Sequence, residues 1–258
     1  MSARAKSGWD VRRVLFAVLG LQLGMAALLA GSDVLGALPQ LLRPSSAPGF
    51  DSPVAPGDQT RRYAPRDTPL PERAPGAPER PYRNTGDMPS RLEFVREGAA
   101  LRLTGTIAPG DDARLAERLE TEVGLERVVL SSPGGSVRDA LEIGRAIRAA
   151  ELATEVEADD VCFSACPYVL AAGVTRSAGE GAQVGVHQHY FGKNTVLPAF
   201  LAVEDIQRGQ GDVMEYLDGM GVDIRLMRPA LATGPDDIYV LLPEELRDYR
   251  LVTGGAED

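Results

Sequence analysis

Three short segments of the chain carry residue types that together could perform acyl transfer. The first is Ser-Pro-Gly-Gly-Ser-Val at 132–137, where paired glycines let the backbone turn and present N–H groups outward. The second contains Ser164, which lies between a short apolar run and an apolar helical segment. The third is Val-His-Gln-His at 186–189, which holds both histidines of the chain. A serine hydroxyl needs a base to remove its proton, and neutral imidazole suits that role.

Each segment taken alone also has a purely structural interpretation. Pro-Gly-Gly is a common turn, and Ser164 could be a simple helix N-cap. Period-two alternation along a strand places His187 and His189 on one side, so they could be part of a metal site. A third ligand of the usual kind is not evident nearby in the sequence, and we therefore expect neither a metal nor another cofactor.

The hydrophobic pattern predicts the elements that must position these segments. A β-branched run at 127–131 leads into the Gly-Gly turn, and apolar residues then recur at helical spacing from Val137 to Ile147. A further short strand is predicted at 154–158. The order strand, loop, helix, strand is that of a parallel α/β unit, in which reactive groups collect at strand ends. Beyond it, the pattern predicts helices at 165–172, 203–220, 223–232 and 243–251 and a strand at 183–188.

The three segments together resemble the proteolytic subunit of the Clp protease, within the crotonase-like superfamily. The resemblance spans roughly residues 128–252 and depends on spacing. Gly135 and Ser164 are 29 residues apart, as the oxyanion glycine and nucleophile are in that family, and 23 residues separate Ser164 from His187. It implies an α/β fold of repeated ββα units arranged in a spiral, and a serine endopeptidase-like hydrolase.

The resemblance also implies a role for each catalytic side chain. Ser164 is the expected nucleophile and His187 the expected general base. Asp237 stands six positions before Pro243, as the family's aspartate precedes a proline, and is the expected carboxylate that orients the imidazole. Asp236 is a near competitor for that role.

Two further expectations come from the same resemblance. The backbone N–H groups of Gly135 and Ala165 are expected to form the oxyanion hole. A related branch, resembling signal peptide peptidase A, uses lysine as the base. Lys193 is the corresponding alternative here, but it lies in a loop-like stretch beyond His187, so the Ser-His-Asp arrangement is preferred. Relatives assemble into rings, which makes a homo-oligomer an expectation of the resemblance.

The sequence departs from the family pattern around the nucleophile. Cys162 and Cys166 flank Ser164 where the family has small residues. They could form a disulfide in an oxidising compartment, or they could be two small buried side chains that fill space. His189 stands where the family often has proline, which leaves the substrate groove uncertain.

The amino-terminal third has a different composition. Within residues 1–43, four basic residues precede an apolar run from Val14 to Ala30, which predicts a transmembrane signal anchor. The positive charge predicts a single pass through the inner (cytoplasmic) membrane with the catalytic domain on the periplasmic side. A cleaved signal peptide is the alternative. Residues 44–91 are rich in Pro, Arg, Asp and Gly and predict a disordered linker, which leaves 92–258 as the folded domain.

The function predicted from these features is a membrane-tethered, extracytoplasmic serine peptidase. It would act without ATP on peptides or on unfolded or membrane-protein segments. A catalytically inactive binding or assembly module with the same fold is the alternative. Acyl-CoA chemistry of the crotonase type is disfavoured because a nucleophilic triad would be superfluous there. The net charge of −10 excludes nucleic acid as an expected partner.

Overall fold

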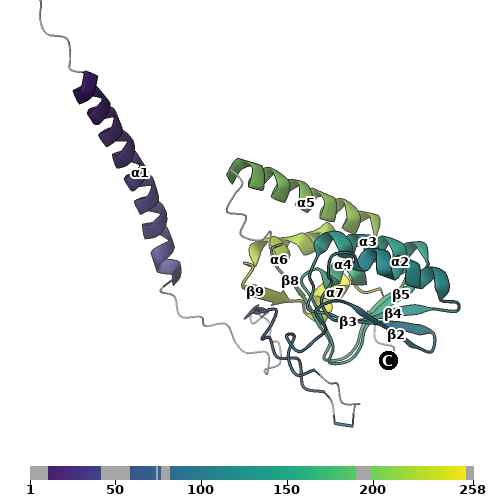
Figure 1. Ribbon diagram of the computed structural model, residues 1–258. Helices are drawn as coiled ribbons and strands as arrows, with labels where there is room; N and C mark the ends of the chain where they lie inside the picture. Colours follow the sequence, from purple (N-terminus) through teal and green to yellow (C-terminus); the bar gives the residue numbers. More distant parts are fainter. Residues whose placement is uncertain (1–10, 42–58, 74, 77–81, 190–198, 254–258) are drawn as a thin grey trace, which may run out of the picture. The chain divides into compact units, whose positions relative to one another are not determined.

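The computed structural model describes residues 11–41, 59–73, 75–76, 82–189 and 199–253 (Figure 1). The chain divides into two compact units, Met1–Ser46 and Ala47–Asp258. The described part of the first unit is a single helix, α1, Val11–Leu41.

The predicted transmembrane anchor is not supported by this helix. Within the described ranges, no helix combines the length and the apolar character needed to cross a bilayer. The apolar run from Val14 to Ala30 is interrupted by Gln22 and followed by Ser32 and Asp33, so it is shorter than the ~20 consecutive apolar residues of a typical span. This corrects the prediction for residues 1–43 and, with it, the predicted single-pass location in the inner membrane.

The second unit is a mixed α/β structure with two sheets, and the first sheet has five strands in the order β2-β3-β4-β5-β7. The β2–β3 pair is antiparallel, and the other neighbours are parallel. Figure 1 shows α2 and α3 side by side next to this sheet. The strands are β2 (Glu93–Glu97), β3 (Ala100–Thr104), β4 (Arg127–Ser131), β5 (Ala153–Val156) and β7 (Arg176–Ala178), and the helices are α2 (Asp111–Thr121) and α3 (Val137–Ala149).

The second sheet has four strands in the order β1-β9-β8-β6. Strands β6 and β8 are parallel, whereas β9 runs antiparallel to both of its neighbours, β8 and β1. Its strands are β1 (Thr60–Arg62), β6 (Val161–Phe163), β8 (Gln183–Val186) and β9 (Asp237–Val240). The remaining helical elements are α4 (Cys166–Leu170), α5 (Ala199–Gly219), the 3-10 turn η1 (Ile224–Leu226), α6 (Met227–Ala232) and α7 (Pro243–Asp248).

The larger apolar core is formed by the five-stranded sheet and the helices that cover it. On α3, the side chains of Ala140, Ile143 and Ile147 recur at spacings of three and four residues and are fully buried. They belong to one continuous cluster with residues of β3, β4, α4 and α5. This core supports the ends of β4 and β6, where the candidate site lies.

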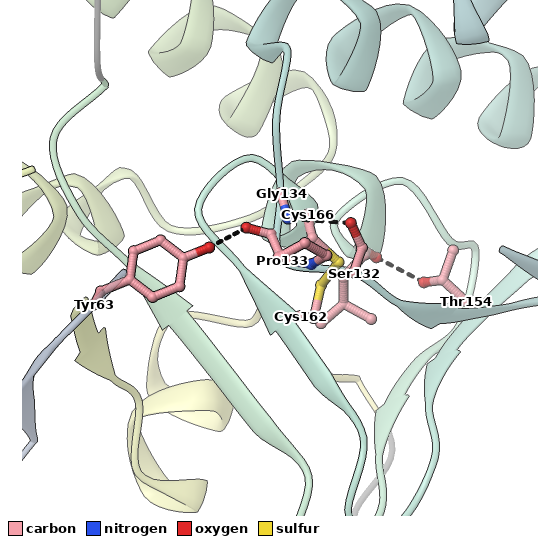
Figure 2. The surroundings of a disulfide bond; sticks show 8 residues. Tyr63, Ser132, Pro133, Gly134, Thr154, Cys162 and Cys166 are labelled. Atoms are coloured by element: carbon pink, nitrogen blue, oxygen red, sulfur yellow. Dashed lines mark hydrogen bonds between the residues drawn. A yellow bond between two sulfur atoms is a disulfide. The ribbon is translucent and has the colours of Figure 1, made fainter. Parts of the chain in front are cut away.

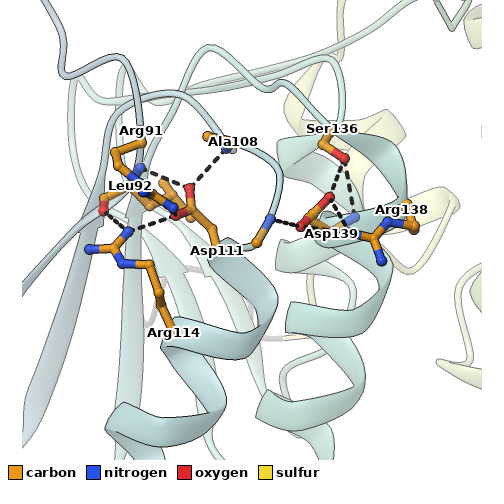
Figure 3. A network of polar contacts seen from close by, with 9 residues as sticks. Arg91, Leu92, Ala108, Asp111, Arg114, Ser136, Arg138 and Asp139 are labelled. Atoms are coloured by element: carbon orange, nitrogen blue, oxygen red, sulfur yellow. Dashed lines mark hydrogen bonds and ion pairs between the residues drawn. The ribbon is translucent and has the colours of Figure 1, made fainter.

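Two buried carboxylates fix the loops that lead into α2 and α3 (Figure 3). Asp111 accepts hydrogen bonds from the N–H groups of Leu92 and Ala108. Asp139 accepts from Gly110 N–H at 2.6 Å and is hydrogen-bonded to the Ser136 hydroxyl. Burial raises the pKa of each carboxyl, but these hydrogen bonds outweigh it and hold both pKa values below the usual range. The carboxylates therefore stay ionised and position the first turn of α3.

The segment that the composition predicted to be a disordered linker is partly ordered. Strand β1 pairs with β9, with Arg61 opposite Ile238. Tyr63, Leu70 and Met88 then pack against residues of β6 and β9 in a second, smaller core. The prediction failed because low hydrophobicity prevents a segment from folding when it must build its own core. It does not prevent a segment from becoming ordered when it adds a strand to the edge of an existing sheet. Residues 44–58 lie outside the described ranges.

These observations correct the predicted fold class. The structure is mixed α/β with two separate sheets, one of which takes its edge strand β1 from the segment before residue 92. The transmembrane helix and the wholly disordered linker are the parts of that prediction that are wrong, whereas β5-β6-α4 followed by β7-β8-α5 has the predicted order of repeated ββα units.

Candidate active site

Ser164 lies at a sharp turn between β6 and α4. Its φ of +60° is in the left-handed region, which costs a residue other than glycine on the order of 1–3 kcal/mol. Its N–H donates to the Gly185 carbonyl at 2.9 Å, which ties the turn to β8. The Ser164 side chain does not cap α4, because the residue preceding that helix is Ala165. The turn instead presents the Ser164 hydroxyl at the end of the strand, an arrangement that also occurs at the catalytic serines of α/β-hydrolases.

His187 comes directly after β8, the parallel neighbour of β6. Because Phe163 is paired with Gly185, the residues that follow the two strands meet at the same sheet edge. The Nε2 atom of His187 lies 2.7 Å from the Ser164 Oγ. This is hydrogen-bonding distance, which a general base requires.

The environment of His187 favours the neutral imidazole. The ring is buried, and burial lowers its pKa below 6.5, while the Pro235 carbonyl and the charge of Asp236 act in the opposite direction. Its Nδ1 atom has no hydrogen-bond partner among the described residues. A neutral imidazole can accept the Ser164 proton near neutral pH, so the ring has the protonation state that a base needs.

The two candidate carboxylates lie in different surroundings. Asp237 begins β9 opposite Arg62, and its carboxylate is 3.8 Å from the Arg62 guanidinium. The backbone carbonyl of Asp236 accepts a hydrogen bond from Tyr63 N–H at 2.9 Å, and its charge raises the pKa of His187. The structure therefore brings Ser164 and His187 together, while the Asp237 carboxylate pairs with arginine.

The Gly-Gly turn packs directly against the Ser164 turn. A Cβ atom on Gly134, whose φ is +94°, would lie 2.5 Å from the Phe163 carbonyl oxygen and 2.6 Å from the Ser164 Cβ, so only glycine fits. The next residue is Gly135. Neither its N–H nor that of Ala165 donates to an acceptor within the described part of the chain. Both N–H groups are thus available beside Ser164, as an oxyanion hole requires.

Cys162 and Cys166 form a disulfide that brackets Ser164 (Figure 2). Their Cα atoms are 5.1 Å apart, and both side chains are fully buried. Cys162 also forms a parallel bridge with Ser132, at the start of the Gly-Gly turn. Of the two interpretations of this cysteine pair, the covalent link is the one present. It joins the strand before the serine to the helix after it.

His189 has a different role from His187. Its Nε2 is 2.7 Å from the Tyr168 hydroxyl, and burial, with a smaller effect of His187, lowers its pKa to about 4. It borders a hollow of about 370 Å³ between α3 and α5, whose apolar wall is formed by Val137 and Leu141. Within the described residues, no three His, Cys, Asp or Glu side chains could hold a metal ion. Lys193, the alternative base, lies outside them.

Tyr63 is a site residue that the sequence analysis missed. Its ring meets the His187 ring edge to face, with centroids 5.3 Å apart. Its hydroxyl donates a hydrogen bond to the Pro133 carbonyl in the Gly-Gly turn (Figure 2). The available signal was an aromatic residue within a segment that otherwise has few apolar residues.

Comparison with known proteins adds no assignment to this geometry. No protein-family model matches the chain, and no curated protein matches it at a significant level.

Proposed function

We propose that the second unit is a serine hydrolase of the peptidase type, with Ser164 as nucleophile and His187 as general base. The single observation that carries the proposal is the 2.7 Å distance between the Ser164 Oγ and the His187 Nε2. The left-handed backbone of Ser164 and the two N–H groups without acceptors beside it support the same chemistry. The resemblance to the Clp proteolytic subunit agrees with this assignment.

The proposed reaction follows from what these groups can donate and accept. The Ser164 Oγ attacks the carbonyl carbon of a peptide, and its proton passes to the His187 Nε2. The oxyanion accepts hydrogen bonds from the N–H groups of Gly135 and Ala165, each worth about 3 kcal/mol in the transition state. The imidazolium then protonates the leaving amine, which leaves an acyl ester on the Ser164 Oγ. Water attacks this ester while the His187 Nε2 takes its proton, and the carboxylic acid is released as the Ser164 hydroxyl is restored. Peptides and unfolded segments are the proposed substrates, cleaved without ATP.

A fluorophosphonate probe tests this proposal directly. The phosphorus atom should become bonded to the Ser164 Oγ with loss of fluoride, and mass spectrometry should locate the adduct on the peptide that contains Ser164. Ser164→Ala should remain unlabelled. Ser136→Ala is the matched control, because Ser136 caps α3 and is not assigned to the chemistry. A folded wild-type protein that stays unlabelled would rule out the hydrolase.

The two neighbouring aspartates give a prediction about the base. Because the charge of Asp236 raises the pKa of His187, Asp236→Asn should lower it and move the acidic limb of the labelling profile to lower pH. Asp237→Asn should move that limb less, since its carboxylate lies beside Arg62. Labelling rates from pH 4 to pH 8 measure both. A loss of about 10⁴-fold in Asp237→Asn alone would instead assign Asp237 the orienting role implied by the resemblance.

A non-catalytic binding module is the second candidate, and one observation favours it. The buried Nδ1 of His187 has no hydrogen-bond partner in the described part of the chain, whereas an active triad has a carboxylate at that position. Under this alternative, Ser164→Ala would retain every binding property of the wild type, and the wild type would not react with the probe.

A further inference from the structure

Tyr63 contacts all three segments that make up the proposed site. Its ring lies 5.3 Å from that of His187 and 5.7 Å from that of Phe163, in both cases edge to face. Its hydroxyl donates to the carbonyl of Pro133 (Figure 2). These partners are the base, the residue before the nucleophile and the turn that carries the oxyanion glycine. One side chain therefore links three parts of the chain that are far apart in sequence.

The backbone of Tyr63 is fixed independently of its side chain. It follows β1, whose three residues pair with β9, and its N–H donates to the Asp236 carbonyl at 2.9 Å. The loop before β9 also accepts a hydrogen bond from the backbone of Gln188, at the Thr233 carbonyl. Tyr63 and Gln188, which is the residue after His187, are thus both hydrogen-bonded to the short segment that precedes β9.

His187 needs such a contact, because hydrogen bonding alone does not orient its ring. Its Nε2 is hydrogen-bonded to the Ser164 Oγ, while its Nδ1 has no partner of good hydrogen-bonding geometry within the described ranges and is influenced by the Pro235 carbonyl, which raises the pKa of the ring. In a usual triad, a carboxylate on Nδ1 fixes the ring plane. Here the edge-to-face contact with a buried aromatic ring is the contact that constrains it.

We propose that Tyr63 is a positioning residue of the active site, which holds the His187 ring against Ser164 through its own ring and the Gly-Gly turn through its hydroxyl. The inference rests on the proposed hydrolase function. It assigns the segment before residue 92 a part in catalysis: strand β1 is a strap that completes the site. Burial raises the pKa of Tyr63, so its hydroxyl stays protonated and remains a donor.

The test compares Tyr63→Leu and Tyr63→Phe in the full chain by fluorophosphonate labelling. Tyr63→Leu removes both contacts, and a displaced base should lower the maximal labelling rate by about 10²-fold with little change in the probe concentration at half-maximal rate. Tyr63→Phe keeps the ring and removes only the hydrogen bond to the Pro133 carbonyl, so we expect a smaller loss of about 10-fold.

A pH profile separates positioning from simple packing. Removing the aromatic ring admits water to His187, and because burial is what lowers its pKa, the acidic limb should move upward toward pH ~6.5 in Tyr63→Leu. In Tyr63→Phe the limb should stay in place. The other groups that act on this ring are Asp236 and the Pro235 carbonyl, with His189 nearby, and both variants retain them.

Tyr82→Leu is the matched control, because Tyr82 packs against the same small core but is not in ring contact with His187 among the described residues. Because Tyr82 is only partly buried, we expect Tyr82→Leu to lose less stability than Tyr63→Leu, to label at the wild-type rate and to leave the acidic limb of the pH profile unmoved. The inference is overturned if Tyr63→Leu labels at the wild-type rate, or if Tyr82→Leu reproduces both of its changes. If Tyr63→Leu does not fold, Tyr63→Phe decides the matter. The inference is overturned if Tyr63→Phe has wild-type stability and also labels at the wild-type rate. An unlabelled wild type instead refutes the hydrolase itself.

Discussion

His187→Ala is expected to lower the rate of Ser164 labelling, and of any peptide hydrolysis, by on the order of 10⁵-fold. Without the imidazole, no group within the described ranges is in hydrogen-bond contact with the Ser164 Oγ, so the attacking oxygen keeps its proton. The residual rate should depend on hydroxide and rise with pH. Labelling kinetics and a peptide cleavage assay measure the loss. His189→Gln is the control and should retain the wild-type rate, because the His189 ring is hydrogen-bonded to the Tyr168 hydroxyl and not to Ser164.

The same role of His187 predicts the direction in which activity changes with pH. The neutral imidazole is the active form, and burial lowers the pKa of His187 below 6.5. The acidic midpoint of the activity profile should therefore lie below pH 6.5, and activity should decline as acid protonates the ring. A profile that is flat from pH 4 to pH 8, or a midpoint above 7, would contradict His187 as the base. Unchanged labelling in His187→Ala would point to Lys193 or another group outside the described residues.

The meeting of Ser164 and His187 was expected from the spacing that the chain shares with the Clp proteolytic subunit, and the structure supplies the local reason, because both residues directly follow short apolar strands. Such strands pair in parallel in an α/β fold, and their carboxyl ends meet at one edge. The orienting carboxylate was harder to predict. Asp236 and Asp237 are adjacent, and which of them faces His187 depends on the turn before β9 and on Arg62, a residue of a different segment. A pattern along one stretch of chain does not contain that information.

The segment before residue 92 shows why composition alone misled the prediction. Proline and arginine indicate disorder when a segment must offset its own ordering entropy. Here Arg61 is almost fully buried and Arg73 pairs with the buried Asp160 at 2.9 Å, so polar residues contribute to the order. The ordering entropy of this segment is offset by its contacts with a sheet that the rest of the chain has already formed. Strand addition of this kind depends on an open edge on β9, which the linker's own residues do not reveal.

Replacing both cysteines, in Cys162→Ala/Cys166→Ala, is expected to lower the free energy of unfolding by about 2 kcal/mol. Closing so short a loop removes little entropy from the unfolded chain, so the estimate is near the low end for disulfides. The labelling rate of Ser164 should fall by more than this loss of stability alone would explain. The disulfide connects the residues on either side of its left-handed turn, and without that link the backbone can relax to a commoner conformation that withdraws the hydroxyl from His187.

Labelling rate and urea unfolding, measured on the same variants, separate these two effects. Val169→Ala truncates a buried side chain on α4 and should cost about 1–3 kcal/mol without touching the link, so its labelling rate should stay at the wild-type value. The double cysteine variant should label about 10-fold or more slowly at a similar stability. Equal rates in the two would show that the disulfide only stabilises the domain. A slower rate in the cysteine variant alone would mean that the covalent link maintains the reactive geometry of Ser164, which explains why cysteines occupy these two positions around a serine.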